Sequence, residues 1–258
     1  MQSYLHLKLA ATTTAPAPIR IEFSPASTPP APGLPGNTVG ETLLQPSVDQ
    51  KTLIVSLGEP SKWKADTFRQ AGGAAARWLL QNKVEQAEIA GTNLSKFEMP
   101  DAISALFEGL LLGAFQFNKY KSEESSPVIP SIFLRTSEPK SFEKILLHAQ
   151  VVCESVNLAR LWGHEPANVI NPLTLAERLT ELATETGLKC TVLDEQALLE
   201  MGAGGLVNVG KGSATPSRLI ILEYLGKPAG GAQEVEHHFS NTRAVAVDRG
   251  QLRRHFNC

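Results

Sequence analysis

The stretch that decides the fold of the second half of the chain is Glu165-Pro-Ala-Asn-Val-Ile-Asn-Pro172. Gly163 and Pro166 end one helical pattern, because glycine weakens a helix and proline cannot continue one. A second helix follows, in which Thr174 is predicted to be the N-cap, with Glu177 three residues later in capping-box register. Gly187 is predicted to stop this helix.

After this helix, the sequence predicts strands that alternate with a helix. Lys189–Leu193 is predicted to be a strand, Asp194–Met201 a short helix, and Arg218–Tyr224 a second strand. Between them, Val209-Gly-Lys-Gly-Ser213 predicts a tight connection. Because so few strands follow, the apolar run Leu219–Leu222 is expected to form an unpaired sheet edge and to make residues 170–226 poorly soluble.

The first half of the chain also alternates strand and helix, which favours an α/β sandwich with a largely parallel sheet. The Gly72-Gly73 pair lies inside the first predicted helix, and we expect it to allow close packing of that helix on the sheet. The predicted strands are Tyr4–Leu9, Ile19–Phe23, Lys51–Gly58 and Ile129–Arg135, and the predicted helices are Asp66–Asn82 and a helix capped by Asp101 that runs to Phe117.

A long helix is predicted from Ser141 to Gly163, with an apolar side formed by Ile145, Val152, Val156 and Ala159. After Gly226 the pattern changes, and only Ala244–Val247 in this tail predicts a strand.

The composition of the chain limits which kinds of partner and which compartment are expected. The chain has 258 residues, a formal net charge of −2 and scattered Lys and Arg, which gives no electrostatic reason to expect a nucleic-acid or membrane partner. The three cysteines are far apart and odd in number, which favours reduced thiols and a cytoplasmic protein. The acid-poor first twenty residues leave an organellar transit segment as the alternative.

Four fragments in order resemble the leucyl aminopeptidase (cytosol aminopeptidase) family. They are similar to the first helix of the family's N-terminal domain, the end of that domain, the linker, and the first strand–helix–strand of the catalytic domain. In this sequence they are Ala65–Arg77, Glu108–Lys121, Arg160–Asn168 and Asp194–Tyr224.

The resemblance implies metal-dependent release of N-terminal amino acids, preferentially leucine, from peptides. In intact relatives two divalent ions, manganese or zinc, are held by a lysine and several carboxylates in a cytoplasmic oligomer that is usually hexameric. Carboxylates hold the two cations close together, and the cations polarise the scissile carbonyl and acidify the attacking water.

The family's ligand motifs are of the type Gly-Lys-Gly-x-x-x-Asp-(Ser/Thr)-Gly-Gly, Lys-x-Asp-Met-Gly-Gly and Asn-Thr-Asp-Ala-Glu-Gly-Arg, and none occurs in these 258 residues. Arg243-Ala-Val-Ala-Val-Asp-Arg-Gly250 starts like the first motif but has Asp248-Arg249 in place of Gly-Lys. We therefore predict no catalytic residue, no cofactor-binding residue and no metal ligand in this chain, and no cofactor bound to it.

The glycine-rich loop near Lys211 resembles two functional motifs and matches neither. Gly210-Lys211-Gly212 resembles the metal-binding lysine motif, but no Asp-(Ser/Thr)-Gly-Gly follows it, so we predict a structural turn. Gly205–Gly212 also matches a phosphate-binding loop, but it lacks the Ser or Thr that must come directly after the lysine.

The remaining chemical candidates have ordinary structural interpretations. The spacing of the C-terminal histidines and cysteine fits no zinc template. The candidate carboxylates are separate from one another and are not paired for acid–base chemistry. The aromatic residues near position 117 are predicted to belong to the domain core. His148 and His164 are predicted to lie on a helix surface and at a helix end. These candidates are His237, His238, His255 and Cys258; Glu98, Asp101, Glu108 and Glu165; and Phe115, Phe117 and Tyr120.

The sequence thus predicts an α/β protein in four parts. They are an N-terminal α/β sandwich (macro-like) domain over 1–140, a linker helix over 141–165, the first part of an incomplete second α/β domain over 166–226, and a divergent, irregular tail over 227–258. The expected function is that of an aminopeptidase family protein without its metal site. The alternatives are a non-catalytic module that assembles with itself or with full-length subunits, and a truncated gene product that a frameshift or retained intron would produce.

Overall fold

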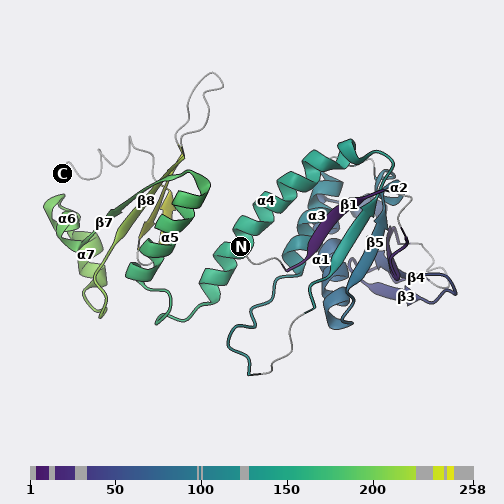
Figure 1. Ribbon diagram of the computed structural model, residues 1–258, viewed down its shortest axis with the longest axis horizontal. Helices are drawn as coiled ribbons and strands as arrows, with labels where there is room; N and C mark the ends of the chain where they lie inside the picture. The colour runs from purple at the N-terminus through teal and green to yellow at the C-terminus, as the bar shows by residue number, and fades with distance from the viewer. Residues whose placement is uncertain are drawn as a thin grey trace, which may run out of the picture. The chain divides into compact units, whose positions relative to one another are not determined.

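The computed structural model describes residues 4–11, 15–26, 34–97, 99, 101–122 and 128–224, together with the backbone of 235–240 and 243–246. The chain divides into two compact units, Met1–His164 and Glu165–Cys258. Each unit is an α/β structure with a sheet of its own, which confirms the predicted fold class (Figure 1).

The first unit contains a six-stranded sheet in the order β1-β6-β5-β2-β4-β3, parallel except for the edge strand β3. A short 3-10 turn at Pro60–Lys62 precedes the first helix. The elements are β1 (His6–Ala10), β2 (Ile19–Ser24), β3 (Thr42–Gln45), β4 (Lys51–Ser56), α1 (Ala65–Gln81), β5 (Gln86–Ala90), α2 (Gly91–Leu94), α3 (Ala102–Gly113), β6 (Ser131–Arg135) and α4 (Pro139–His164).

The core of this unit lies between the sheet and the helices α1, α3 and α4 (Figure 1). Strand β2 shows why the strands face it as they do: Ile19, Ile21 and Phe23 alternate inward while Arg20 and Glu22 point the other way. Helix α1 buries the apolar face that its spacing predicts.

The paired glycines of α1 pack on a helix and not on the sheet, so the predicted packing partner was wrong. A Cβ atom on Gly72 would collide with the carbonyl oxygen of Leu106 in α3, and one on Gly113 would lie 2.5 Å from the Cα of Gly73. Glycine at these positions lets the backbones of α1 and α3 touch.

Three details of the helices differ from the sequence prediction. Helix α3 ends at Gly113, before Phe117, and Asp101 precedes it in a left-handed conformation (φ 63°) without a side-chain capping bond. Helix α4 turns a different face to the core from the predicted one. Its buried residues are Phe142, Leu146, Ala149, Cys153 and Asn157.

A buried carboxylate joins the loop before β2 to the sheet. The Glu88 side chain on β5 is 3% exposed and accepts hydrogen bonds from the Ala17 amide (2.9 Å) and from Arg135 Nε (2.5 Å). Arg20 Nη2 lies 3.5 Å from the other carboxylate oxygen. Burial raises the pKa of Glu88, but hydrogen bonds from Gln50, Ala17 and Arg135 outweigh it and leave this pKa below its ordinary value.

The second unit contains an antiparallel sheet in the order β10-β9-β8-β7. Helix α5 contacts β7 and β8, and a small core joins α6 and α7 to the sheet through Leu198, Val207 and Leu219. The elements are α5 (Pro172–Thr186), β7 (Lys189–Leu193), α6 (Glu195–Glu200), α7 (Gly204–Gly210), β8 (Leu219–Tyr224), β9 (Val235–Ser240) and β10 (Arg243–Ala246).

Two expectations for this unit were wrong. The apolar strand β8 is not an edge, because it pairs with β7 on one side and with β9 on the other. The tail predicted to be irregular contributes two strands, β9 and β10, and the second of them overlaps the only strand predicted there.

Candidate functional site

The segment quoted first in the sequence, Glu165–Pro172, builds the start of α5. Asn171 is the N-cap: its Oδ1 accepts hydrogen bonds from the amides of Leu173 (3.1 Å) and Thr174 (3.2 Å). Thr174 completes the reciprocal bond, since its hydroxyl accepts from the Asn171 amide (3.0 Å). The predicted box of Thr174 with Glu177 is therefore wrong by three residues, and Gly187 ends the helix as predicted, at φ 72°.

The Gly210-Lys211-Gly212 turn lies at the end of a helix that the sequence did not predict. Gly210 closes α7, and a Cβ atom there would collide with the hydroxyl of Ser217. Ser217 is buried, and its amide donates to Glu195 Oε2 (3.3 Å). Lys211 is exposed and forms no ion pair with any residue that the structure describes. This geometry supports a structural role for the turn.

A phosphate-binding loop does not fit the same residues. Such a loop connects a strand to the start of a helix, whose amides point at the phosphate. Here Gly204–Gly210 is itself the helix α7, and the element before it is the helix α6. The geometry therefore excludes a phosphate-binding loop of this type at these residues.

The described residues do not fit a dinuclear metal centre. They contain no group of three or more His, Cys, Asp or Glu side chains close enough to hold a metal ion. Glu108 forms an ion pair with Arg69 (2.7 Å). Of the other candidates, Asp101 precedes α3 and Glu165 begins the second unit, His237 and His238 are described by backbone alone in β9, and Glu98, His255 and Cys258 lie outside the described residues.

The aromatic residues near the end of α4 do not form the domain core that the sequence predicts. Phe115 and Phe117 are half-buried, and Tyr120 is 56% exposed. Their rings meet His164, the last residue of α4, with ring centroids 5.4 Å and 5.3 Å from those of Phe115 and Phe117. His148 is exposed on the surface of α4, as predicted.

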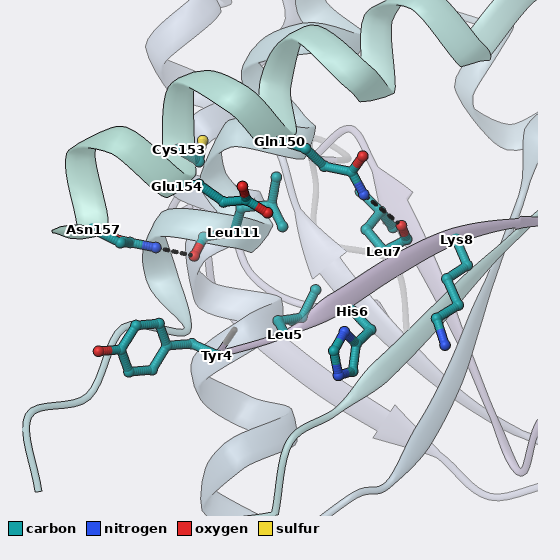
Figure 2. A pocket seen from close by; sticks show the side chains of 10 residues that line it. All are labelled: Tyr4, Leu5, His6, Leu7, Lys8, Leu111, Gln150, Cys153, Glu154 and Asn157. Atoms are coloured by element: carbon teal, nitrogen blue, oxygen red, sulfur yellow. Dashed lines mark hydrogen bonds between the residues drawn. The ribbon is translucent and has the colours of Figure 1, made fainter. Parts of the chain in front are cut away.

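A small polar cavity of about 120 Å³ lies between β1 and α4 (Figure 2). From α4, the Gln150 amide donates to the carbonyl of Leu7 (3.0 Å) and that of Asn157 to the carbonyl of Leu111 (3.3 Å). Cys153 lies between them and is 1% exposed. Burial, and then the charge of Glu108, raises the pKa of this thiol to about 12. Because the thiolate is the nucleophile, burial and a raised pKa make this thiol a poor nucleophile at neutral pH.

A second, more open depression of about 370 Å³ lies where α1 crosses α3. Its lining includes the glycines of the crossing and three arginines, Arg69, Arg77 and Arg160. No sequence pattern predicts this cluster, because Arg160 lies in a different helix from Arg69 and Arg77 and is distant from them in the chain.

No helix among the described residues has both the length and the apolar character needed to cross a membrane.

Comparison with family models accounts for most of the chain. Residues 38–124 match the model of the cytosol aminopeptidase family, N-terminal domain, and residues 157–236 match the model of the catalytic domain of the same family. The second match continues past Tyr224, where the resemblance was expected to end.

Individual relatives agree with the family models. A probable cytosol aminopeptidase of Aquifex aeolicus is 36% identical over 200 residues, which is 76% of this chain and 39% of the relative. A probable cytosol aminopeptidase of Rhodococcus opacus is 36% identical over 182 residues, 68% of this chain and 34% of the relative. The chain thus spans well under half the length of these curated relatives.

Solved structures share the fold. The bottromycin maturation enzyme BotP aligns with a TM-score of 0.69 at 26% identity, over 81% of this chain and 46% of that one. A tomato leucine aminopeptidase mutant aligns with a TM-score of 0.73 at 18% identity, over 87% of this chain and 51% of that one, a likeness of fold alone. Two family models, in order along one chain, and relatives above 30% identity support one conclusion: this chain belongs to the cytosol aminopeptidase family.

Proposed function

We propose that residues 1–258 carry the N-terminal domain, the linker helix and the first part of the catalytic domain of a cytosol aminopeptidase, and that they form no catalytic metal centre by themselves. The proposed boundaries are 1–140 for the N-terminal domain and 141–165 for the linker helix, with the first part of the catalytic domain from 166 to 236, where the family match ends. The observation that carries the proposal is the lack of any grouping of three or more His, Cys, Asp or Glu side chains among the described residues.

The family activity is metal-dependent release of N-terminal amino acids, preferentially leucine, from peptides. The bottromycin maturation enzyme BotP has been solved in complex with Mn. We propose that the intact relatives of this chain use manganese or zinc, act on peptides and assemble as hexamers. We propose the cytoplasm as the compartment of this chain. Residues that hold the metals would then not come from the described part of this chain.

An activity assay tests this proposal. The purified chain is incubated with leucine p-nitroanilide and added Mn²⁺, and release of p-nitroaniline is followed by absorbance. We expect no turnover above the uncatalysed rate. The Aquifex aeolicus relative, prepared in the same way, is the positive control. Turnover by the chain alone that a chelator abolishes would contradict the proposal.

The second candidate function is a non-catalytic assembly module that joins intact family subunits. An exposed side of α4 favours it: Leu147 is 61% exposed and Val151, one turn later, is 56% exposed, while Val152 and Val156 form a second apolar stripe on another side of the helix. Large apolar side chains gathered on one exposed helix face are typical of an interaction surface. The family's catalytic-domain match begins at residue 157, inside this helix.

Co-expression tests the assembly function. The chain is co-expressed with a tagged intact relative, and we expect it to be retained through the affinity purification. A variant with Leu147→Lys and Val151→Lys should be lost, whereas Ser141→Lys, on an exposed position of the same helix, should be retained. Equal retention of both variants, or no retention of the parent chain, would rule out this surface.

A further inference from the structure

The depression at the crossing of α1 and α3 has a floor of backbone without side chains. Gly73 of α1 and Gly109 and Gly113 of α3 line it, and their contacts leave no room for Cβ atoms at either position of α3. Helix packing explains the glycines. The same packing leaves an open depression of about 370 Å³, in which a ligand would contact the helix backbone and the surrounding arginine side chains.

The three arginines around this floor differ in whether a carboxylate already pairs with their charge. Arg69 is bound on both sides, by Glu108 Oε2 (2.7 Å) and by Asp66 Oδ1 (3.1 Å). Asp66, the carboxylate in the lining, is further occupied by Gln70 Nε2 (2.6 Å). The acidic groups at this site are therefore already paired, and Arg69 offers little charge to a ligand.

Arg77 and Arg160 keep their charge. Within the part of the chain that the structure describes, neither forms an ion pair with a carboxylate. Arg77 folds back over its own helix, so that its Nη1 lies 3.1 Å from where a Cβ atom of Gly73 would be. Arg160 uses one nitrogen for its hydrogen bonds, since its Nη1 donates to the carbonyl of Leu112 (3.1 Å) and to Asn157 Oδ1 (3.4 Å), and its guanidinium carbon lies 5.9 Å from the centroid of the Phe115 ring.

These contacts place two guanidinium groups at one glycine floor. Arg77 lies on Gly73, Gly73 contacts Gly113, and Arg160 binds the carbonyl of the residue before Gly113. A guanidinium group has five N–H donors, so the Nε and Nη2 groups of Arg160 and the whole of Arg77 are left for a ligand. With Arg69, Asp66 and Glu108 counted as well, the cluster has a net charge of one positive unit, and Arg77 and Arg160 are its two arginines without a carboxylate partner in the described structure.

We propose that this depression is a binding site for a small phosphate-bearing molecule, with Arg77 and Arg160 as the ligands of its phosphate group. Two guanidinium groups without carboxylate partners can each bind phosphate oxygens through their planar N–H forks. A phosphate group presents three acceptor oxygens and can bind both forks at once, whereas a carboxylate has two. The site is separate from the peptidase chemistry of the family and goes beyond the proposed function.

Calorimetric titration of the 258-residue chain with inorganic pyrophosphate tests the site, at an ionic strength held constant with NaCl. We expect saturable binding to one site per chain, and weaker binding of citrate, which tests whether a carboxylate source serves equally well. Arg77→Gln and Arg160→Gln should each weaken pyrophosphate binding about tenfold, the loss expected when one charged hydrogen-bonding group is removed.

The matched control is Arg178→Gln, which makes the same charge change in α5 of the second unit and should bind pyrophosphate like the parent chain. Arg160 also holds the end of α3, so its variant is checked by circular dichroism. Arg77 forms no hydrogen bond in the described structure, and its variant keeps the test decisive if Arg160→Gln fails to fold. Absence of saturable binding, tighter binding of citrate, or unchanged binding by Arg77→Gln would overturn the proposal.

Discussion

Gly113 at the end of α3 lies against Gly73 in the middle of α1, so closely that a Cβ atom on Gly113 would be 2.5 Å from the Cα of Gly73. Two helices that touch through backbone cannot accept side chains at the point of contact. This contact sets how closely α1 and α3 approach each other, and it explains why a helix with good periodicity carries residues that weaken helices.

Gly113→Ala is expected to destabilise the first unit by about 2 kcal/mol, because the backbones of α1 and α3 must separate to admit the methyl group. Gly163→Ala is the matched control. Gly163 also lies in a helix, but a Cβ atom there would meet nothing within 4 Å. This variant should gain up to about 1 kcal/mol from helix propensity. Urea unfolding of both variants measures the difference, and equal effects would show that the helices do not touch as described.

Glu88→Gln is expected to destabilise the first unit by about 3 kcal/mol at pH 7, because it leaves Arg135 without the charge of its buried partner. Glu85→Gln, an exposed position just before the same strand, is the control and should change stability little. Urea unfolding at pH 7 measures both.

The pH dependence of stability should follow Glu88 in the parent chain. The pKa of Glu88 is lowered in the folded protein, so its contribution is fully present above the ordinary value of 4.5 and is lost as the pH falls through the lowered value. Unfolding midpoints measured from pH 7 to pH 3 should fall more steeply for the parent than for Glu88→Gln. Parallel pH profiles would contradict the assigned network.

Asn171→Ala should destabilise the second unit by about 1 kcal/mol, the usual cost of losing an N-cap side chain. Glu177→Ala should have almost no effect, since Glu177 is exposed and the capping bonds come from Asn171 and Thr174. Thermal unfolding followed by circular dichroism distinguishes the two. A larger effect of Glu177→Ala would restore the capping box that the sequence first suggests.

Cys153 should be almost unreactive in the folded chain. With a pKa raised to about 12, only about one thiol in ten thousand is ionised at pH 8. Reaction with a disulfide reagent is measured on Cys190→Ser/Cys258→Ser, which leaves Cys153 alone, and on Cys153→Ser/Cys258→Ser, which leaves the half-buried Cys190. Cys190 should react faster by at least about 100-fold, and the difference should vanish in denaturant. Equal rates in the folded state would mean that the first unit opens around α4.

Local patterns in the sequence predicted the elements whose signals are complete within a few residues. The alternation of β2, the apolar face of α1 and the stop at Gly187 all depend on neighbours along the chain. Strand β5 was missed because Glu88 interrupts its apolar run, and partners distant in the chain, among them Arg135 and the Ala17 amide, stabilise that buried charge. Helix α4 is apolar on two sides, so its pattern could not say which side meets the core.

Of the candidate functional features, too, some could be predicted from the sequence and others could not. The lack of ligand motifs is a property of the sequence and could be read directly. The depression at the crossing of α1 and α3 could not be predicted, because it depends on helix packing that brings Arg77 and Arg160 together from distant parts of the chain.

Metal stoichiometry tests the central claim most directly. The 258-residue chain is dialysed to equilibrium against Mn²⁺ or Zn²⁺, and the bound metal is measured by elemental analysis, with the Aquifex aeolicus relative as the positive control. We predict no stoichiometric binding by the chain and a bound pair of ions in the relative. A dinuclear cluster held within a single copy of these residues would contradict the account.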